Sequence, residues 1–105
     1  MKVYISGKMA GMNEKQSRAM FKECELALKA KGCKVVNPWD TQDEKKKSCK
    51  KWGDFIRYDL ELLDGCDAIC MLPSWLNSKG AMVEYHYAKG SGMKIWRYFY
   101  GEIIL

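Results

Sequence analysis

The feature that most constrains this chain is a short, uninterrupted apolar run, Ala68 to Leu72, which Pro73 ends. The run is far shorter than the roughly 18 apolar residues that a membrane span needs, and no other segment reaches that length. A short run without apolar and polar alternation is typical of a strand that is covered on both faces, as in a parallel sheet between helices. It therefore predicts the central strand of an α/β domain.

Strand and helix patterns alternate along the rest of the chain. We expect the other strands at residues 2–6, 33–36 and 93–99, and the helices at about 14–31, 51–64 and 80–89. This βαβαβαβ order predicts a doubly wound parallel sheet of about four strands in a three-layer α/β/α arrangement. Residues 1–105 are predicted to form a single domain, because the length suits one core and no repeat divides it.

The segments between these elements are the candidates for binding. In a doubly wound sheet, ligands bind at the carboxyl ends of the strands, near the point where the strand order reverses. That rule selects residues 7–11, 37–40 and 73–80 as the loops of a site. The polar, lysine-rich residues 39–50 are predicted to be a connecting loop with room for a helical turn, and the residues after 99 a short tail.

The net charge of +5 is concentrated in one stretch, Lys45-Lys46-Lys47-Ser48-Cys49-Lys50-Lys51. We favour a solvated loop for this stretch. The functional alternative is attraction for an anionic ligand such as a phosphate. Binding of nucleic acid is disfavoured, because no aromatic residues are interleaved with these lysines.

The cysteines and the single histidine limit the chemistry further. The chain has five cysteines at irregular spacing and no C-x-x-C pair, which argues against a disulfide framework and against a zinc site. One histidine, His86, excludes a His-rich metal site. The start of the chain resembles a strand rather than a signal peptide. We therefore expect a cytoplasmic protein without a membrane segment, metal or other cofactor, and with Cys70 as a core residue rather than a nucleophile.

An inward-facing carboxylate marks the predicted helix at 51–64. Asp59 lies in the apolar stripe of this helix, which is formed by Trp52, Phe55, Ile56, Leu62 and Leu63. Burial of a carboxylate costs several kcal/mol unless a partner compensates it. A structural explanation is an ion pair with Lys or Arg, or the capping of a loop.

A second carboxylate repeats the pattern on the next helix. Glu84 lies in a stripe with Ala81, Tyr85 and Ala88, one turn from the start of the helix, where the dipole favours its ionised form. Two inward acids on helices that flank one strand are harder to explain structurally than one. Paired carboxylates suit glycosyl chemistry, in which one attacks the anomeric carbon and the other helps the leaving group.

Four short segments around these acids occur in an order that is known from one superfamily. They are Val3-Tyr4-Ile5-Ser6-Gly7, Val35-Val36-Asn37-Pro38, Asp59-Leu60 with Cys66-Asp67-Ala68, and Ser78-Lys79-Gly80-Ala81 ahead of Glu84. With these segments the chain resembles the nucleoside 2-deoxyribosyltransferase superfamily, and especially its short phage and bacterial relatives. The resemblance implies a flavodoxin-like fold and assembly into homodimers or larger homo-oligomers.

The resemblance also implies roles for individual residues. Glu84 falls on the family's nucleophile, Tyr4 on the tyrosine that orients it, and Asp59 on the aspartate that contacts the sugar or assists protonation of the base. Ser6 and Asn37 fall on segments that border the substrate.

The position six residues before the nucleophile bears on the reaction. The transferases typically have an acid there, whereas this chain has Ser78, which is similar to relatives that hydrolyse nucleoside 5′-monophosphates. Gly7, Lys8, Ser78 and Gly80 are then expected to form a phosphate cradle. The chain departs from those hydrolases after the first glycine, where they carry serine and arginine and it has Lys8 and Ala10. Lys8 replaces one phosphate contact without a bidentate fork.

Several aromatic residues have two interpretations. Trp39 and Trp75 lie in predicted site loops, where they either stack on a base or anchor the loop. His86 is expected to be structural. The cluster Trp96, Tyr98, Phe99 and Tyr100 is expected to form the last strand and an oligomer contact.

These observations predict an N-glycosidase that cleaves the base–sugar bond of a nucleoside 5′-monophosphate through a covalent intermediate on Glu84. One alternative uses the same chemistry with a second base as acceptor, as in a 2-deoxyribosyltransferase. The other is a protein that binds or senses nucleotides without turning them over. In each case the partner is a small nucleoside or nucleotide.

Overall fold

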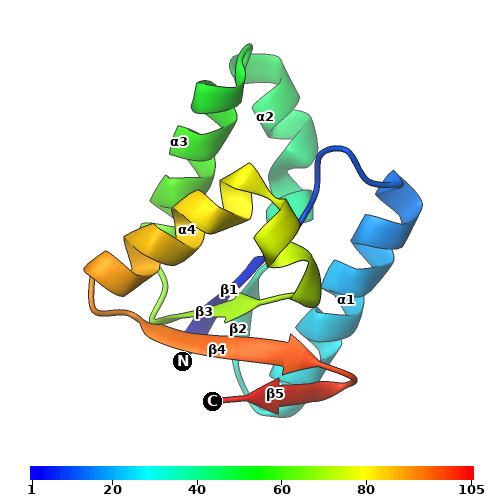
Figure 1. Cartoon of the computed structure of the whole chain (residues 1–105), viewed down its shortest axis with the longest axis vertical. Coiled ribbons are helices and arrows are strands. Elements are labelled where there is room, and N and C mark those ends of the chain that lie inside the picture. Colours follow the sequence, from blue (N-terminus) through cyan, green and yellow to red (C-terminus); the bar gives the residue numbers. More distant parts are fainter.

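Strand β3 (Ala68–Met71), formed by the uninterrupted apolar run, lies at the centre of a five-stranded sheet. The computed structural model describes all 105 residues, and its sheet has the order β2-β1-β3-β4-β5 (Figure 1). The other strands are β1 (Lys2–Ser6), β2 (Lys34–Val36), β4 (Lys94–Phe99) and β5 (Glu102–Ile104). Strands β1 to β4 are parallel, and β5 runs antiparallel to β4. The predicted doubly wound α/β fold is confirmed, and this strand order is the flavodoxin-like one.

Helices cover both faces of the sheet. They are α1 (Glu14–Ala30), η1 (Pro38–Thr41), α2 (Gln42–Ser48), α3 (Trp52–Asp64), η2 (Pro73–Asn77) and α4 (Lys79–Gly90). Figure 1 shows α1 to the right of the strands and α3 and α4 on their other side. None of these helices is both long and apolar enough to cross a bilayer.

The period-two alternation of the buried strands divides the core into two layers. On one side, Val3, Ile5 and Cys70 pack against Phe21 and Leu28 of α1. On the other side, the intervening residues of the same strands pack against α3 and α4. That second cluster is formed by Tyr4, Leu63, Cys66, Ile69, Met71, Ala81 and Ala88. Residues 3–6 of β1 are fully buried. Because successive side chains of a strand alternate between its faces, Tyr4 places a polar hydroxyl on the α4 side.

Side-chain caps start helices α1 and α4. Asn13 accepts a hydrogen bond from the Gln16 amide at the start of α1, and Ser78 accepts one from the Ala81 amide at the start of α4. Each cap satisfies one of the free N–H groups that a helix leaves at its N-terminus.

The segment at residues 39–50 is not the loop that its sequence predicts. It folds into η1 and α2, and α2 buries a single side chain, that of Lys45. Because a seven-residue helix of polar residues has no apolar stripe, periodicity does not reveal it.

The end of the chain also differs from the prediction. The expected tail forms β5, a fifth strand that pairs Phe99 with Glu102 across a two-residue turn. Both turn residues, Tyr100 and Gly101, have positive φ angles of 47° and 81°. This is the backbone that a tight hairpin requires, and a tyrosine at the first of its positions hides the usual sequence signal.

Candidate active site

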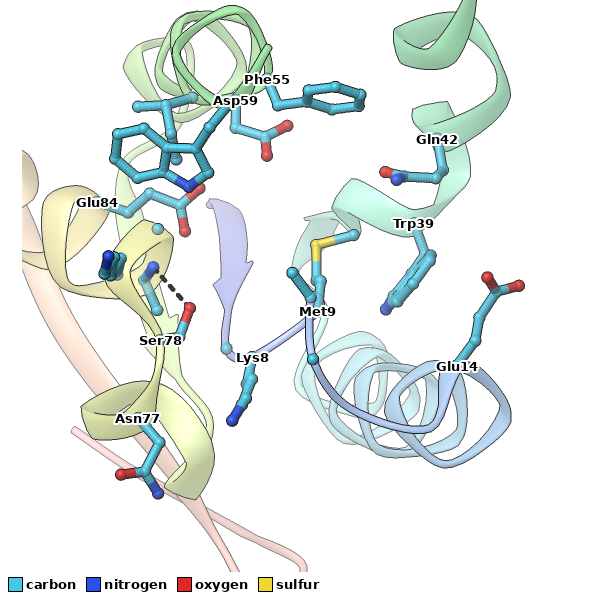
Figure 2. A pocket seen from close by; sticks show the side chains of 18 of the residues that line it. Lys8, Met9, Glu14, Trp39, Gln42, Phe55, Asp59, Asn77, Ser78 and Glu84 are labelled. Carbon is cyan, nitrogen blue, oxygen red and sulfur yellow. Dashed lines mark hydrogen bonds between the residues drawn. The ribbon is translucent and has the colours of Figure 1, made fainter. Parts of the chain in front are cut away.

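A cavity of about 710 Å³ opens where the strand order reverses, between β1 and β3. Its walls are the segment after β1 from Gly7 to Gly11, the start of α4 and one face of α3. Figure 2 shows the carboxylates of Glu84 and Asp59 turned toward the same space, with Ser78 and Lys8 on one side and Trp39 across from them. The fold therefore brings the two inward acids to one cavity.

Glu84 is the most tightly held group of the cavity. Tyr4 donates its hydroxyl to Oε2 at 2.7 Å, and Ser6 donates its hydroxyl to Oε1 at 2.6 Å. Burial raises the pKa of Glu84 to about 7; the hydrogen bonds from Ser6 and Tyr4 oppose this rise, and the charge of Asp59 adds to it. The carboxylate is thus fixed in position and titrates close to neutral pH, as a nucleophile or general base does.

Tyr4 and Ser6 reach Glu84 from strand β1. Both residues are fully buried, so neither borders the cavity directly. Burial, with the negative charge of Glu84 next in effect, raises the pKa of Tyr4 well above its usual value. Tyr4 consequently remains protonated and donates its hydrogen bond throughout the neutral range. Ser6, like Tyr4, is a hydrogen-bond donor to Glu84. It therefore lies behind the cavity surface and not in the predicted position against the substrate.

Asp59 is held by a lysine from the stretch that was predicted to be solvated. Lys45 is fully buried, and its Nζ lies 2.7 Å from Asp59 Oδ1 and donates to the Pro38 carbonyl at 2.7 Å. Oδ1 accepts no hydrogen bond, so its ion pair with the Lys45 ammonium alone compensates it. Burial raises the pKa of Asp59 in spite of the opposing effect of Lys45. The solvated-loop interpretation is therefore wrong for Lys45, although Lys46, Lys47, Lys50 and Lys51 are exposed.

The end of the cavity away from Asp59 has hydrogen-bond donors and positively charged side chains. Gly7, Lys8, Ser78, Lys79 and Gly80 all border it. The N-terminus of α4 lies here, where free backbone N–H groups and the helix dipole favour an anion. A Cβ atom on Gly7 would lie 2.8 Å from Leu72 Cδ1, so only glycine fits between β1 and the end of β3.

Aromatic side chains form a third part of the lining. Trp39 borders the cavity and is anchored by its Nε1–H to Ser17 Oγ at 3.2 Å and by an edge contact with Phe21. Trp52 and Phe55, at the start of α3, also line the cavity, and Trp52 is 55% exposed. The outer part of the α3 stripe therefore faces the cavity instead of the core.

Other predicted residues lie elsewhere. Trp75 stacks on Tyr85 with ring centroids 4.6 Å apart and does not border the cavity. Asn37 also lies outside it: its Nδ2 donates to Glu25 and its Oδ1 accepts from the Trp39 amide. His86 is exposed and lies against the edge of Tyr85.

Two further chemical possibilities concern metals and thiols. No group of three or more His, Cys, Asp or Glu side chains is arranged to hold a metal ion. Cys70 is buried in β3, with its Sγ 3.7 Å from that of Cys24, and it does not border the cavity.

The solved structures that resemble this chain include two enzymes. The 2-desoxiribosyltransferase from Leishmania mexicana matches with a TM-score of 0.67 and 18% identity over 92% of this chain. The chain spans 63% of the length of that protein. The Clostridium botulinum CMP N-glycosidase BcmB matches with a TM-score of 0.62 and 21% identity, over 95% of this chain and 76% of the other. At these identities the likeness confirms the fold of the superfamily that the sequence resembles.

Sequence comparison assigns a family. None of the curated proteins matches the sequence. Residues 1–97 match the model of a family described as a domain of unknown function, DUF4406, and the chain belongs to that family.

Proposed function

We propose that this protein is an N-glycosidase that cleaves the base–sugar bond of a nucleoside 5′-monophosphate. The observation that carries the proposal is the Glu84 carboxylate, which two hydroxyl donors hold at the wall of a nucleotide-sized cavity beside a second carboxylate. The two solved structures provide support, because one is a CMP N-glycosidase and the other a 2-desoxiribosyltransferase.

In the proposed reaction, a Glu84 oxygen forms a bond to C1′ of the sugar. The C1′–N bond breaks, its electron pair leaves with the base, and the base takes up a proton from the solvent. Water then attacks C1′, releases a proton and frees Glu84, so that the products are a base and a sugar phosphate. Tyr4 and Ser6 position the nucleophile through their hydrogen bonds, and Asp59 contacts the sugar and assists departure of the base.

The two ends of the cavity suit the two ends of a nucleotide. The phosphate is assigned to the start of α4, where Lys8 and Lys79 add positive charge to the helix terminus. The base is assigned to the side formed by Trp39, Trp52 and Phe55, where flat apolar surfaces are available for stacking. Ser78 favours hydrolysis of a phosphorylated substrate, since an acid at this position would repel the phosphate.

A product analysis tests the proposal. The protein is incubated with a panel of nucleosides and nucleoside 5′-monophosphates, with and without a second free base, and the products are separated by chromatography. We expect free base and sugar 5-phosphate from a monophosphate without an added acceptor. Base exchange that strictly requires an acceptor would instead identify a transferase, and thermal stabilisation by nucleotides without products would identify a binding protein.

Two variants separate the chemistry from the binding. Glu84→Gln keeps the shape of the nucleophile and is expected to lose activity by at least about 1,000-fold. Glu61→Gln, an exposed residue on the outer face of α3, is the matched control and is expected to keep full activity. Full activity of Glu84→Gln would contradict the assignment of the nucleophile.

We also propose that the protein assembles into a homodimer or a larger homo-oligomer. The apolar side chains of Phe99, Tyr100, Ile104 and Leu105 are exposed around the β4–β5 hairpin. Sedimentation velocity at micromolar concentration measures the assembly, and a purely monomeric species would contradict it.

A further inference from the structure

A buried lysine without an assigned function lies behind the two acids. Lys45 is completely inaccessible to solvent although it belongs to a run whose other lysines are exposed. Its ammonium contacts two acceptors, the Asp59 carboxylate and the Pro38 carbonyl, each at 2.7 Å. A buried ammonium costs several kcal/mol of folding free energy when it is unpaired. The two contacts of Lys45 are therefore needed to keep its side chain in the interior.

We propose that Lys45 is a positioning residue of the site, whose ammonium fixes the Asp59 carboxylate and balances its charge beside Glu84. This inference rests on the proposed function for the meaning of the two acids. It adds a third charged group to them, one that comes from α2 and does not border the cavity.

Two neighbouring carboxylates need a cation close to them if both are to be ionised. When two carboxylates share a site of low dielectric constant, each disfavours ionisation of the other, and one of them retains a proton. The proposed chemistry requires Glu84 to be ionised while Asp59 lies next to it. A cation paired with Asp59 reduces the net charge of the Asp59–Lys45 pair to zero, so Glu84 can ionise close to neutral pH.

The charged and titratable groups around Glu84 support this assignment. From β1 it is faced by Tyr4, which stays protonated, from α3 by Asp59, and from α2 by Lys45. The two charges act on the pKa of Glu84 in opposite directions, Asp59 upward and Lys45 downward. Around Asp59, the additional groups are the neighbouring Tyr58, whose ring centroid is 5.9 Å from Lys45 Nζ, and Glu44, which accepts from the Tyr58 hydroxyl.

The contacts of Lys45 also join α2 to two neighbouring elements. Its hydrogen bond to the Pro38 carbonyl ties α2 to η1, and its ion pair ties α2 to α3. The position of α2, which carries the cavity residues Gln42 and Lys46, thus depends on the same contact that holds Asp59.

Carbon-detected NMR titration of the free protein tests the proposal without any activity. The side-chain carboxyl carbons of Glu84 and Asp59 are followed against pH in the wild type and in Lys45→Met, with Lys47→Met as the matched control because Lys47 is exposed on the same helix. In Lys45→Met we expect at least one of the two acids to keep its proton to a pH about one unit higher. Lys47→Met should titrate like the wild type. Unchanged titration of both acids in folded Lys45→Met would overturn the proposal.

A second pair of variants keeps the test decisive if Lys45→Met does not fold. Asp59→Asn leaves Lys45 unopposed, so Glu84 should titrate at a lower pH than in the wild type. Lys45→Met combined with Asp59→Asn removes both charges and should return Glu84 to within about half a pH unit of the wild type. Equal Glu84 titration in the single Asp59→Asn and the double variant would overturn the role of Lys45. Because these titrations need no substrate, they stay informative if the nucleotide panel yields no product.

Discussion

Tyr4 donates a 2.7 Å hydrogen bond to Glu84 Oε2 and so joins residues that are 80 positions apart in the sequence. The bond connects β1 to α4 within the core layer to which β3 also contributes side chains. Both partners are buried, so solvent cannot replace either of them. The carboxylate is therefore held by the sheet rather than by its own helix, which gives it a fixed direction toward the cavity.

Removal of that hydroxyl should change the pH dependence of the reaction. Tyr4→Phe leaves Glu84 with one hydroxyl donor, Ser6, and the lost hydrogen bond lets the pKa of Glu84 rise further. The nucleophile must be ionised, so the acid limb of the kcat profile should move to higher pH, with kcat about tenfold lower at pH 7. The deficit should shrink above pH 8, as Glu84 ionises in both proteins. A pH-independent loss would show that Tyr4 acts in another way.

The buried Glu84 should also cost stability at neutral pH. Its pKa is about 7 in the folded protein, against an ordinary value of 4.5, so between these values the folded state binds more protons than the unfolded state. Stability of the wild type should therefore fall as the pH rises from 4.5 to 7. Glu84→Gln removes this titration and should be more stable than the wild type by up to about 3 kcal/mol at pH 8.

Urea unfolding at pH 4, 6 and 8 measures this effect. The advantage of Glu84→Gln over the wild type should be smallest at pH 4, larger at pH 6 and largest at pH 8. The same comparison with Glu61→Gln, which alters an exposed carboxylate, should show little pH dependence. An advantage that is equal at all three pH values would argue against a raised pKa of Glu84.

Ser78 offers a test of the phosphate end. Asp is as good a helix cap as Ser, so Ser78→Asp should keep the cap of α4 and its stability while adding a negative charge. KM for a nucleoside 5′-monophosphate should rise at least about tenfold, with little change for the unphosphorylated nucleoside. Ser78→Ala separates the two effects, since it should lose about 1 kcal/mol of stability without repelling phosphate. Equal changes for both substrates in Ser78→Asp would place the phosphate elsewhere.

Gly7 should tolerate no side chain. The Cβ atom of Gly7→Ala would lie 2.8 and 2.9 Å from Leu72 Cδ1 and Cβ, so the ends of β1 and β3 would have to separate. Such overpacking should cost about 1–3 kcal/mol and weaken substrate binding through the displaced segment 8–11. Gly90→Ala is the matched control, because its Cβ atom meets nothing within 4 Å at the end of α4. Thermal unfolding compares the two, and equal stability of both variants would contradict the close approach.

Much of this architecture can be predicted from local patterns. The apolar run at Ala68–Leu72 predicted β3, and helical spacing identified Asp59 and Glu84 as inward-facing acids on two helices. Such predictions succeed because strand and helix periods of 2 and 3.6 residues translate spacing directly into facing direction. Local patterns did not predict the short or polar elements β5 and α2. For β5, an unusual tyrosine occupied the turn, and for α2, the buried residue was itself a lysine.

The partners of the two acids depended on contacts that the sequence does not display. Spacing predicts that a carboxylate faces inward, but not what compensates it, because Lys45, Tyr4 and Ser6 come from other elements and approach only in the folded sheet. The same holds for the aromatic lining, where Trp52 faces the cavity and Trp75 stacks on Tyr85. The sequence by itself determined the layers and the inward direction of Asp59 and Glu84, since both follow from local periodicity. Tertiary structure alone decided how those charges are balanced, since the free energy of a buried charge depends on every group that surrounds it.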